Sequence, residues 1–298
     1  MKFVNAAAMV RKAHEGRYAV PAFNTNGGNY DIARAALEAA QETGSPLVLQ
    51  AYEPNLEYRG MAFMVRLAEA LCDDLDVTAP VALHIDHGHS RESALRAFKA
   101  GFTSYMIDAS HEPLAENIRV TRDVLNIARA LGCSVEAEVG YVAGNEKTAA
   151  PAAGRIPVPE RPAGPSARTI PEEAERFVKE TEVDMLAVAV GTRHGVFQCQ
   201  DEIDFGLLRT LRERLDVPLV QHGTGGVSTD DLRRLAAGGM AKVNFGEPFR
   251  YDYIRRFNAL TDEMAHLWHP WRIEREVKNR LKADMKALIE ALGSAGKA

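Results

Sequence analysis

Three histidines in separate parts of the chain share a pattern that suits metal binding. Each is followed by glycine: His87 in DHGH, His194 in RHGV and His222 in QHGT. Glycine lets the backbone turn sharply and approach a ligand closely. Three neutral imidazoles with one open position are the ligand set of a catalytic Zn²⁺ site. We therefore expect these histidines to bind zinc, or another divalent metal in its place.

Acidic side chains accompany the histidines. Asp86 directly precedes His87, where its carboxylate could bind the metal, orient a water molecule or transfer a proton. Asp108 and Glu138 lie at the ends of two other apolar runs and are expected to face the same cavity. They would balance the charge of the metal or form an alternative metal position.

Eight short apolar runs, rich in Val, Ile, Leu and Ala, must position these groups. Separated by segments of helical periodicity, they cover residues 18–24, 46–52, 80–86, 103–108, 134–140, 185–191, 218–223 and 241–246. Nearly continuous apolar character is typical of parallel strands buried on both faces. The pattern predicts an α/β fold, a (β/α)8 TIM barrel, with residues 1–298 forming a single catalytic domain. A doubly wound open sheet is the alternative, but its glycine fingerprint is absent from the first turn.

The catalytic groups of such a barrel lie at the C-terminal ends of its strands. Polar or ionisable residues stand at or near these ends: Asn24, Tyr52, Asp86, Asp108, Glu138, His194, His222 and Asn244. A structural core would not place so many polar groups there, because each would have to be paired or hydrated. The sequence therefore predicts an enzyme.

Two segments depart from the alternation of strands and helices. Residues 151–168, PAAGRIPVPERPAGPSAR, are too rich in proline for a helix or a central strand. We expect them to form a loop over the active-site face. Residues 273–298 are expected to form an extra C-terminal helix and tail, packed outside the barrel or against another subunit.

Composition narrows the partners and the compartment. A net charge of −5 without a basic patch argues against a nucleic-acid partner. The apolar runs are too short to span a bilayer, so no membrane partner is expected. The N-terminus lacks the uninterrupted apolar stretch of a signal peptide, and the three cysteines show no pairing pattern. These features predict a cytoplasmic protein.

The order and spacing of several motifs resemble the class II, metal-dependent fructose/tagatose-bisphosphate aldolase family over nearly the whole chain. The motifs include VPAFNTN, VALHIDHGHS, GFTSYMIDASH, LAVAVGTRHG and GMAKVNFG. The resemblance implies Zn²⁺ on the three histidines, a small-molecule sugar or sugar-phosphate substrate, and a homodimer or homotetramer. It implies that Asp86 carries the proton of the C4 hydroxyl as the C3–C4 bond breaks. Glu146, in YVAGNEKT, would handle the proton of the enediolate.

The resemblance also implies contacts with substrate. Asn24 and Asn244 would contact substrate hydroxyls or the enediolate. Gly195 and Gly223 would line the donor end and a monovalent-cation site. Gly246 would mark a close approach of the backbone to substrate.

The site that holds the donor phosphate in this family departs from the family pattern here. A serine in the family's HGGSG matches Gly225 of HGTGG, a second serine matches Tyr52, and a threonine matches Glu247. All three side-chain hydroxyls are lost, although Thr224 supplies one a residue earlier. Arg193, where the family has Ser or Asn, would offer a new anion contact.

Glu247 adds a charge as well as removing a hydroxyl. A carboxylate ~5 Å from a phosphate, at an effective dielectric of ~20, costs roughly 3 kcal/mol per unit of phosphate charge. One interpretation is that Glu247 takes the place of the phosphate and binds a neutral or cationic head group. The alternative is that Glu247 turns outward as an acidic residue at a helix start.

These features predict a zinc-dependent class II aldolase that reversibly cleaves a ketose through a metal-stabilised enediolate, with a non-phosphorylated or otherwise atypical donor. One alternative is an ordinary fructose/tagatose-bisphosphate aldolase using dihydroxyacetone phosphate. Another is a metal-dependent sugar-acid epimerase that uses the same retro-aldol chemistry without releasing fragments, with Arg193 binding the carboxylate. A zinc hydrolase and a non-catalytic relative fit the residues less well, because the first needs a His-x-His pair and the second would not need Asp86 and Glu146.

Overall fold

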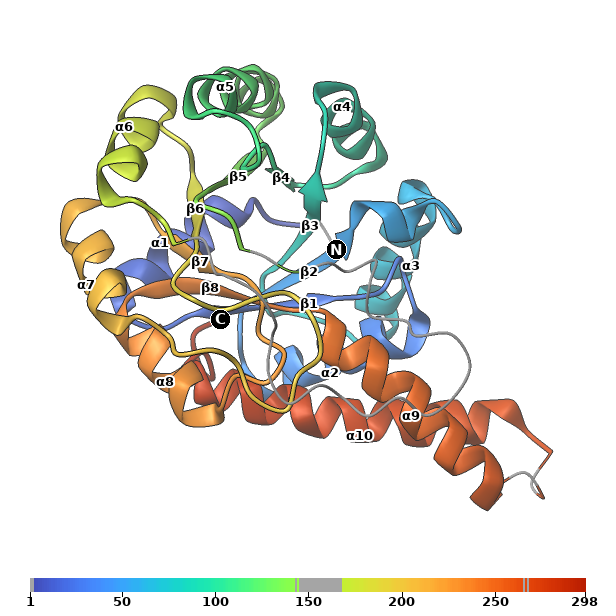
Figure 1. Cartoon of the computed structure of the whole chain (residues 1–298). Helices are drawn as coiled ribbons and strands as arrows, with labels where there is room; N and C mark the ends of the chain where they lie inside the picture. The colour runs from blue at the N-terminus through green and yellow to red at the C-terminus, as the bar shows by residue number, and fades with distance from the viewer. Residues whose placement is uncertain (1–2, 143, 145–167, 265, 267) are drawn as a thin grey trace.

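Eight parallel strands pair in chain order and close into a barrel (Figure 1). The computed structural model describes residues 3–142, 144, 168–264, 266 and 268–298. The strands are β1 (Val20–Asn24), β2 (Leu47–Tyr52), β3 (Val81–Gly88), β4 (Ser104–Ile107), β5 (Ser134–Val139), β6 (Met185–Val188), β7 (Leu219–Gln221) and β8 (Met240–Phe245). Every residue of these strands is buried except Tyr52, which is half-buried, as expected for parallel strands covered on both faces.

One helix precedes the first strand, and the later helices lie around the barrel (Figure 1). The helices are α1 (Ala6–Gly16), α2 (Tyr30–Thr43), a 3₁₀ turn η1 (Glu53–Leu56), α3 (Met61–Asp74), α4 (Arg91–Ala100), α5 (Leu114–Leu131), α6 (Pro171–Thr181), α7 (Phe205–Arg214), α8 (Thr229–Gly238), α9 (Glu247–Met264) and α10 (Pro270–Ala291). The predicted barrel is confirmed. The doubly wound alternative is wrong, because β1 pairs with β8 and closes the sheet.

The register of the strands brings polar residues into the barrel interior. Tyr52 of β2 pairs with Asp86 of β3, and Ala22 of β1 pairs with Asn244 of β8. Alternate residues of a strand face the same side. Three pairs of polar residues spaced by two therefore each share one face of their strand: His84 with Asp86, Glu136 with Glu138, and Lys242 with Asn244.

A buried ion pair lies inside the barrel, near the three histidines. Lys242 Nζ donates to Glu136 Oε2 at 2.8 Å and to Asn244 Oδ1 at 2.7 Å, and the side chains of Lys242 and Glu136 are fully buried. Burial opposes ionisation of Glu136, but the charge of Lys242 holds the pKa of this carboxyl well below its usual value. His84 lies 3.8 Å from the same carboxylate, and burial lowers its pKa to about 3.

The predicted C-terminal helix forms α10 and packs outside the barrel against α2 (Figure 1). Its buried face includes Ile273, Val277, Leu281, Met285 and Ile289. The tail then docks at the end of α2, where Ala298 N donates to Gly44 O and the Ser294 and Ser45 hydroxyls lie 2.8 Å apart. Of the predicted loop 151–168, only Arg168 belongs to the described residues. No helix among the described residues combines the length and apolarity needed to cross a membrane.

Candidate active site and metal centre

His87, His194 and His222 converge at the C-terminal ends of β3, β6 and β7, although they are far apart in the sequence. One ring nitrogen from each lies within 4.8 Å of the others. The ring centroids are 5.0 Å apart for His87 and His194, 4.9 Å for His87 and His222, and 5.7 Å for His194 and His222. Three imidazole nitrogens in this arrangement suit a tetrahedral divalent metal, above all Zn²⁺.

The backbone around His87 is shaped to aim its ring. His87 has φ 50°, in the left-handed region that non-glycine residues seldom occupy. The register between β3 and β4 shifts between Ile85 and Gly88, which breaks the regular alternation of the strand. A Cβ on Gly88 would lie 2.1 Å from the buried Tyr105 ring, so the turn requires glycine here. Strain of this kind is typical of functional positions.

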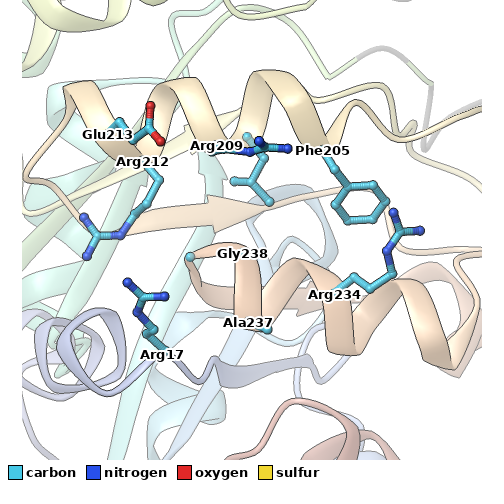
Figure 2. Close-up of a pocket in the computed structure, with 10 residues that line it drawn as sticks. Arg17, Phe205, Arg209, Arg212, Glu213, Arg234, Ala237 and Gly238 are labelled. Carbon is cyan, nitrogen blue, oxygen red and sulfur yellow. The ribbon is translucent and has the colours of Figure 1, made fainter.

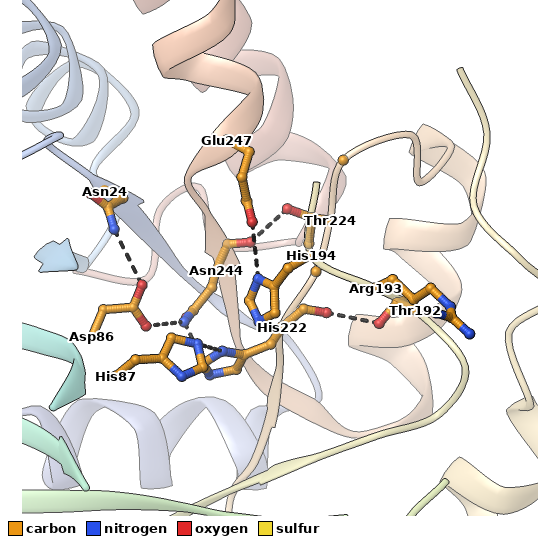
Figure 3. A network of polar contacts seen from close by, with 12 residues as sticks. Asn24, Asp86, His87, Thr192, Arg193, His194, His222, Thr224, Asn244 and Glu247 are labelled. Carbon is orange, nitrogen blue, oxygen red and sulfur yellow. Dashed lines mark hydrogen bonds and ion pairs between the residues drawn. The ribbon is translucent and has the colours of Figure 1, made fainter. Parts of the chain in front are cut away.

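Each histidine ring has one nitrogen held by a carboxylate. His87 Nδ1 lies 2.7 Å from Asp108 Oδ2, and His222 Nε2 lies 2.8 Å from Glu136 Oε1. The third pair is His194 Nδ1 and Glu247 Oε1 at 3.0 Å (Figure 3). Such contacts fix the tautomer and direct the opposite ring nitrogen at the metal.

Neighbouring charges set the ionisation of these carboxylates. Burial would raise the pKa of Asp108, but the hydrogen bond with His87 holds it well below its usual value. Burial likewise opposes the ionisation of Glu247, and the hydrogen bond from His194 lowers its pKa. Both residues are therefore ionised at neutral pH and act as hydrogen-bond acceptors.

The predicted alternative metal position also forms a group. Ligand atoms of His87, Asp108 and Glu138 lie within 4.8 Å of one another. Burial and the charge of Asp108 raise the pKa of Glu138 to about 7. One of its oxygens accepts a hydrogen bond from Val142 N at 2.9 Å.

Asp86 lies beside the histidines with both oxygens occupied by amide donors. Asn24 Nδ2 donates to Oδ2 at 3.2 Å, and Asn244 Nδ2 donates to Oδ1 at 3.1 Å (Figure 3). Burial alone would raise the pKa of Asp86, but the charges of His87, His222 and Lys242 lower it. The two asparagines thus hold an ionised carboxylate in one orientation.

The loops after β6 and β7 pack closely at the predicted donor end. A Cβ on Gly225 would lie 1.9 Å from Gly195 O, and a Cβ on Gly223 would lie 2.5 Å from Arg193 C. Gln200 Nε2 joins the loops by donating to Arg193 O at 2.8 Å, Gly223 O at 3.3 Å and Gly225 O at 2.6 Å. That Gly195 and Gly223 line the donor end of the substrate and a monovalent-cation site stays a prediction.

Other predicted substrate contacts have varied surroundings. The Thr224 hydroxyl donates to Asn244 O at 2.6 Å, and the Tyr52 ring lies 6.2 Å from the His87 ring. Arg193 extends away from the histidine rings (Figure 3), and its Nε lies 3.3 Å from Asp201 Oδ2. The structure therefore does not bring Arg193 to the metal site.

Gly246 has room for a side chain among the described residues, and its predicted close approach to substrate stays a prediction. A Cβ there would meet Asn24 Cβ at 3.5 Å, an ordinary contact. The packing of the described residues therefore does not require glycine at this position. Glu146 lies outside the described residues, so its predicted role stays a prediction.

The outward orientation considered for Glu247 is wrong. The residue is 3% exposed and its carboxylate contacts His194. The reason is its position as the first residue of α9, directly after β8, where the helix start faces the barrel mouth. Its contact with a substrate head group stays a prediction.

Sequence reasoning did not single out Lys242 and Gln200. Lys242 had a detectable signal, because it is a lysine in an apolar strand and lies two residues before Asn244, on the same strand face. Gln200 had none, because it lies in an irregular loop and donates to backbone carbonyls of its own loop and of the loop after β7.

A separate cavity of about 500 Å³ lies between α7 and α8 (Figure 2). It is lined by arginines and apolar side chains, including Arg17, Arg212, Arg234 and Phe205. None of the histidines or carboxylates of the metal site lines it, so this cavity is distinct from the site described above.

Comparisons with known proteins agree with this geometry. The sequence model of the family described as Fructose-bisphosphate aldolase class-II matches residues 4–297. Fructose-bisphosphate aldolase of Geobacillus stearothermophilus is 35% identical over 299 residues, which cover 100% of this chain and 99% of the relative. The 6-phospho-5-dehydro-2-deoxy-D-gluconate aldolase of Bacillus subtilis is 33% identical over 299 residues, covering 100% of this chain and 98% of the relative.

Solved structures support the same assignment. The YdjI aldolase from Escherichia coli K12 matches with a TM-score of 0.83 and 27% identity over 99% of both chains. The chain therefore belongs to the class II fructose-bisphosphate aldolase family and is a class II aldolase, a metal-dependent carbon–carbon lyase.

Proposed function

We propose that this protein is a zinc-dependent aldolase that reversibly cleaves a ketose-type substrate whose donor end is atypical for the family. The observation that carries the aldolase chemistry is Asp86, an ionised and oriented carboxylate beside three convergent histidines. A Zn²⁺ ion held by His87, His194 and His222 would polarise the substrate carbonyl and stabilise the charge that develops on it.

Asp86 would act on the hydroxyl of the substrate. As the C3–C4 bond breaks, the C4 hydroxyl loses its proton to Asp86 and becomes an aldehyde, while the electron pair of that bond stays with the donor fragment. The amides of Asn24 and Asn244 hold the carboxylate in place for this transfer. In the direction of synthesis, Asp86 would return the proton to the new alkoxide.

Lys242 is a poor candidate for the alternative chemistry, in which a lysine forms a Schiff base with the substrate. A nucleophilic lysine must be neutral and reachable. The Lys242 side chain is 0% exposed, and its Nζ donates to Glu136 and Asn244. Sodium borohydride added during turnover should therefore leave no covalent adduct on the protein.

The donor end lacks the side-chain hydroxyls that would hold a phosphate in the family. A side chain with a hydroxyl does not fit at position 225 in the present geometry, because its Cβ would collide with Gly195 O. The hydroxyl proton of Thr224 is already donated to Asn244 O. These features support a donor head group that does not depend on hydroxyl side chains.

The charge of the site supports the same proposal. Asp86, Asp108, Glu136 and Glu247 all have lowered pKa values, so four carboxylates face the single ammonium of Lys242. Histidines that bind a metal are neutral, so with Zn²⁺ bound these four carboxylates exceed the charges of Lys242 and the metal by one. A neutral head group would enter this field at lower electrostatic cost than a phosphate dianion.

The named relatives favour the competing proposal, a phosphorylated substrate. Fructose-bisphosphate aldolase and 6-phospho-5-dehydro-2-deoxy-D-gluconate aldolase are both named for phosphorylated compounds. The test is a retro-aldol assay of Zn²⁺-loaded protein with fructose 1,6-bisphosphate, tagatose 1,6-bisphosphate and the corresponding non-phosphorylated ketoses. Asp86→Asn protein serves as the control for cleavage at this site. Release of dihydroxyacetone phosphate from the bisphosphates alone would refute the atypical donor.

Product analysis also distinguishes cleavage from epimerisation. An aldolase yields two fragments, whereas an epimerase yields one isomer of the starting compound. In an epimerase, Arg193 is predicted to bind the carboxylate of the sugar acid. The side chain of Arg193 extends away from the histidines (Figure 3). We therefore expect fragments, and recovery of a single isomer would refute the aldolase proposal.

A further inference from the structure

The histidine cluster has three carboxylate supports, one for each ring. Asp108 and Glu136 project from the end of β4 and from β5, inside the barrel mouth. Glu247 comes instead from the first turn of α9, and its side chain points towards His194 (Figure 3). All three contacts have carboxylate-to-nitrogen distances between 2.7 and 3.0 Å.

The contact between Glu247 and His194 is buried and joins two segments that are distant in the sequence. The two side chains are 4% and 10% exposed, so water does not screen the pair strongly. The partners lie 53 residues apart, on the loop after β6 and on the helix after β8. An acidic residue that only favoured the start of a helix would need neither burial nor a ring partner.

We propose that Glu247 is a positioning residue of the metal centre. Its carboxylate keeps the proton of His194 on Nδ1, which leaves the Nε2 lone pair for the metal, and it fixes the orientation of the ring. This inference rests on the proposed metal site, but not on the identity of the substrate. His194, the ligand that Glu247 contacts, lies on the loop after β6, whereas His87 belongs to β3 and His222 directly follows β7.

The length of the side chain is central to this role. A threonine at position 247 would end at the γ position, two bonds short of the glutamate oxygens, so its hydroxyl would not reach His194 from the same backbone. A glutamine has the same length and can accept a hydrogen bond, but it carries no charge. The two replacements therefore separate the loss of the contact from the loss of its charge.

The experiment measures metal affinity on the metal-free full chain, without any substrate. The proteins compared are wild type, Glu247→Gln, Glu247→Thr and the control Glu263→Gln, which removes an exposed carboxylate from the same helix. The affinity for Zn²⁺ is measured by competition with a chelating fluorophore. Visible absorption of the Co²⁺-loaded proteins reports the ligand geometry, and thermal unfolding of the metal-free proteins reports stability.

We expect Glu247→Thr to weaken Zn²⁺ binding by about 10- to 100-fold and to alter the Co²⁺ spectrum, since loss of such a partner has effects of this size. Glu247→Gln should show a smaller loss, of about 10-fold at most, and Glu263→Gln should match the wild type. Affinities within twofold of wild type for Glu247→Thr, with an unchanged Co²⁺ spectrum, would overturn the proposal. A lower Tm of the metal-free variant with unchanged affinity would also overturn it, because that result describes a purely structural residue.

The result is independent of the proposed substrate. If wild-type protein binds Zn²⁺ tightly and the Glu247 variants bind it weakly, the positioning role holds even when no ketose is cleaved. That combination would count against the proposed function alone. A wild-type chain that binds neither Zn²⁺ nor Co²⁺ would overturn both proposals.

Discussion

Gly225→Ser is the replacement that would restore a family hydroxyl at the donor end, and the structure predicts that it fails. The new Cβ would lie 1.9 Å from Gly195 O, 3.0 Å from Gly195 C and 3.4 Å from Val196 Cα. These are backbone atoms, so no side-chain rotation relieves the clash. The loops after β6 and β7 would have to separate by about 1.5 Å to reach an ordinary contact distance.

The magnitude follows from two contributions. Overpacking of this kind costs about 1–3 kcal/mol. Separation of the loops would also strain the hydrogen bonds from Gln200 to Gly225 O and Gly223 O, at about 0.5–1.5 kcal/mol each. A combined loss of about 3 kcal/mol corresponds to a fall in Tm of roughly 6–12 °C.

Thermal unfolding of wild type and Gly225→Ser measures the loss of stability. KM for fructose 1,6-bisphosphate measures whether the new hydroxyl improves binding of the bisphosphate. Gly246→Ala is the matched control for stability, because its Cβ would meet Asn24 Cβ at 3.5 Å without collision. We expect Gly225→Ser to lose stability and gain no affinity for the bisphosphate, and Gly246→Ala to stay within about 2 °C of wild type. A Gly225→Ser protein with wild-type Tm and a lower KM would refute the reasoning about the closely packed loops.

Lys242→Met should lower the free energy of unfolding by about 3–5 kcal/mol in urea, because Glu136 would stay buried without its counter-charge. Adding Glu136→Gln should recover part of this loss, and no recovery would contradict the explanation. Burial and the charge of Lys242 lower the pKa of His84 to about 3. The stability that neutral His84 contributes is therefore present above pH 6.5 and is lost as the pH falls towards 3. Between pH 6.5 and 4.5, wild type should lose roughly 2 kcal/mol more stability than His84→Gln, whereas equal losses would contradict this assignment. Asn24→Ala should lower kcat/KM by about 10- to 100-fold, because one oxygen of Asp86 loses its donor, and a change below twofold would exclude this role.

Much of the fold could be predicted because its signals are local. Each β-strand is a continuous apolar run, each intervening helix repeats apolar residues on one face, and Gly44 ends α2 in the left-handed conformation expected of a C-cap. Eight strands that alternate with helices in this way are typical of a barrel, and the missing glycine fingerprint argues against a doubly wound open sheet. The same pattern places the ends of the strands together, so His87, His194 and His222 could be assigned to one site.

The barrel, the convergence of the three histidines and the aldolase family could therefore be predicted from local patterns and motifs. The contact of Glu247 with His194, the pairing of Lys242 with Glu136 and the lack of room at Gly225 became visible only in the folded chain. The reason is physical: periodicity specifies which face of an element is buried. A contact of 3 Å across 53 or 106 residues depends on where two backbones end and how their side chains turn.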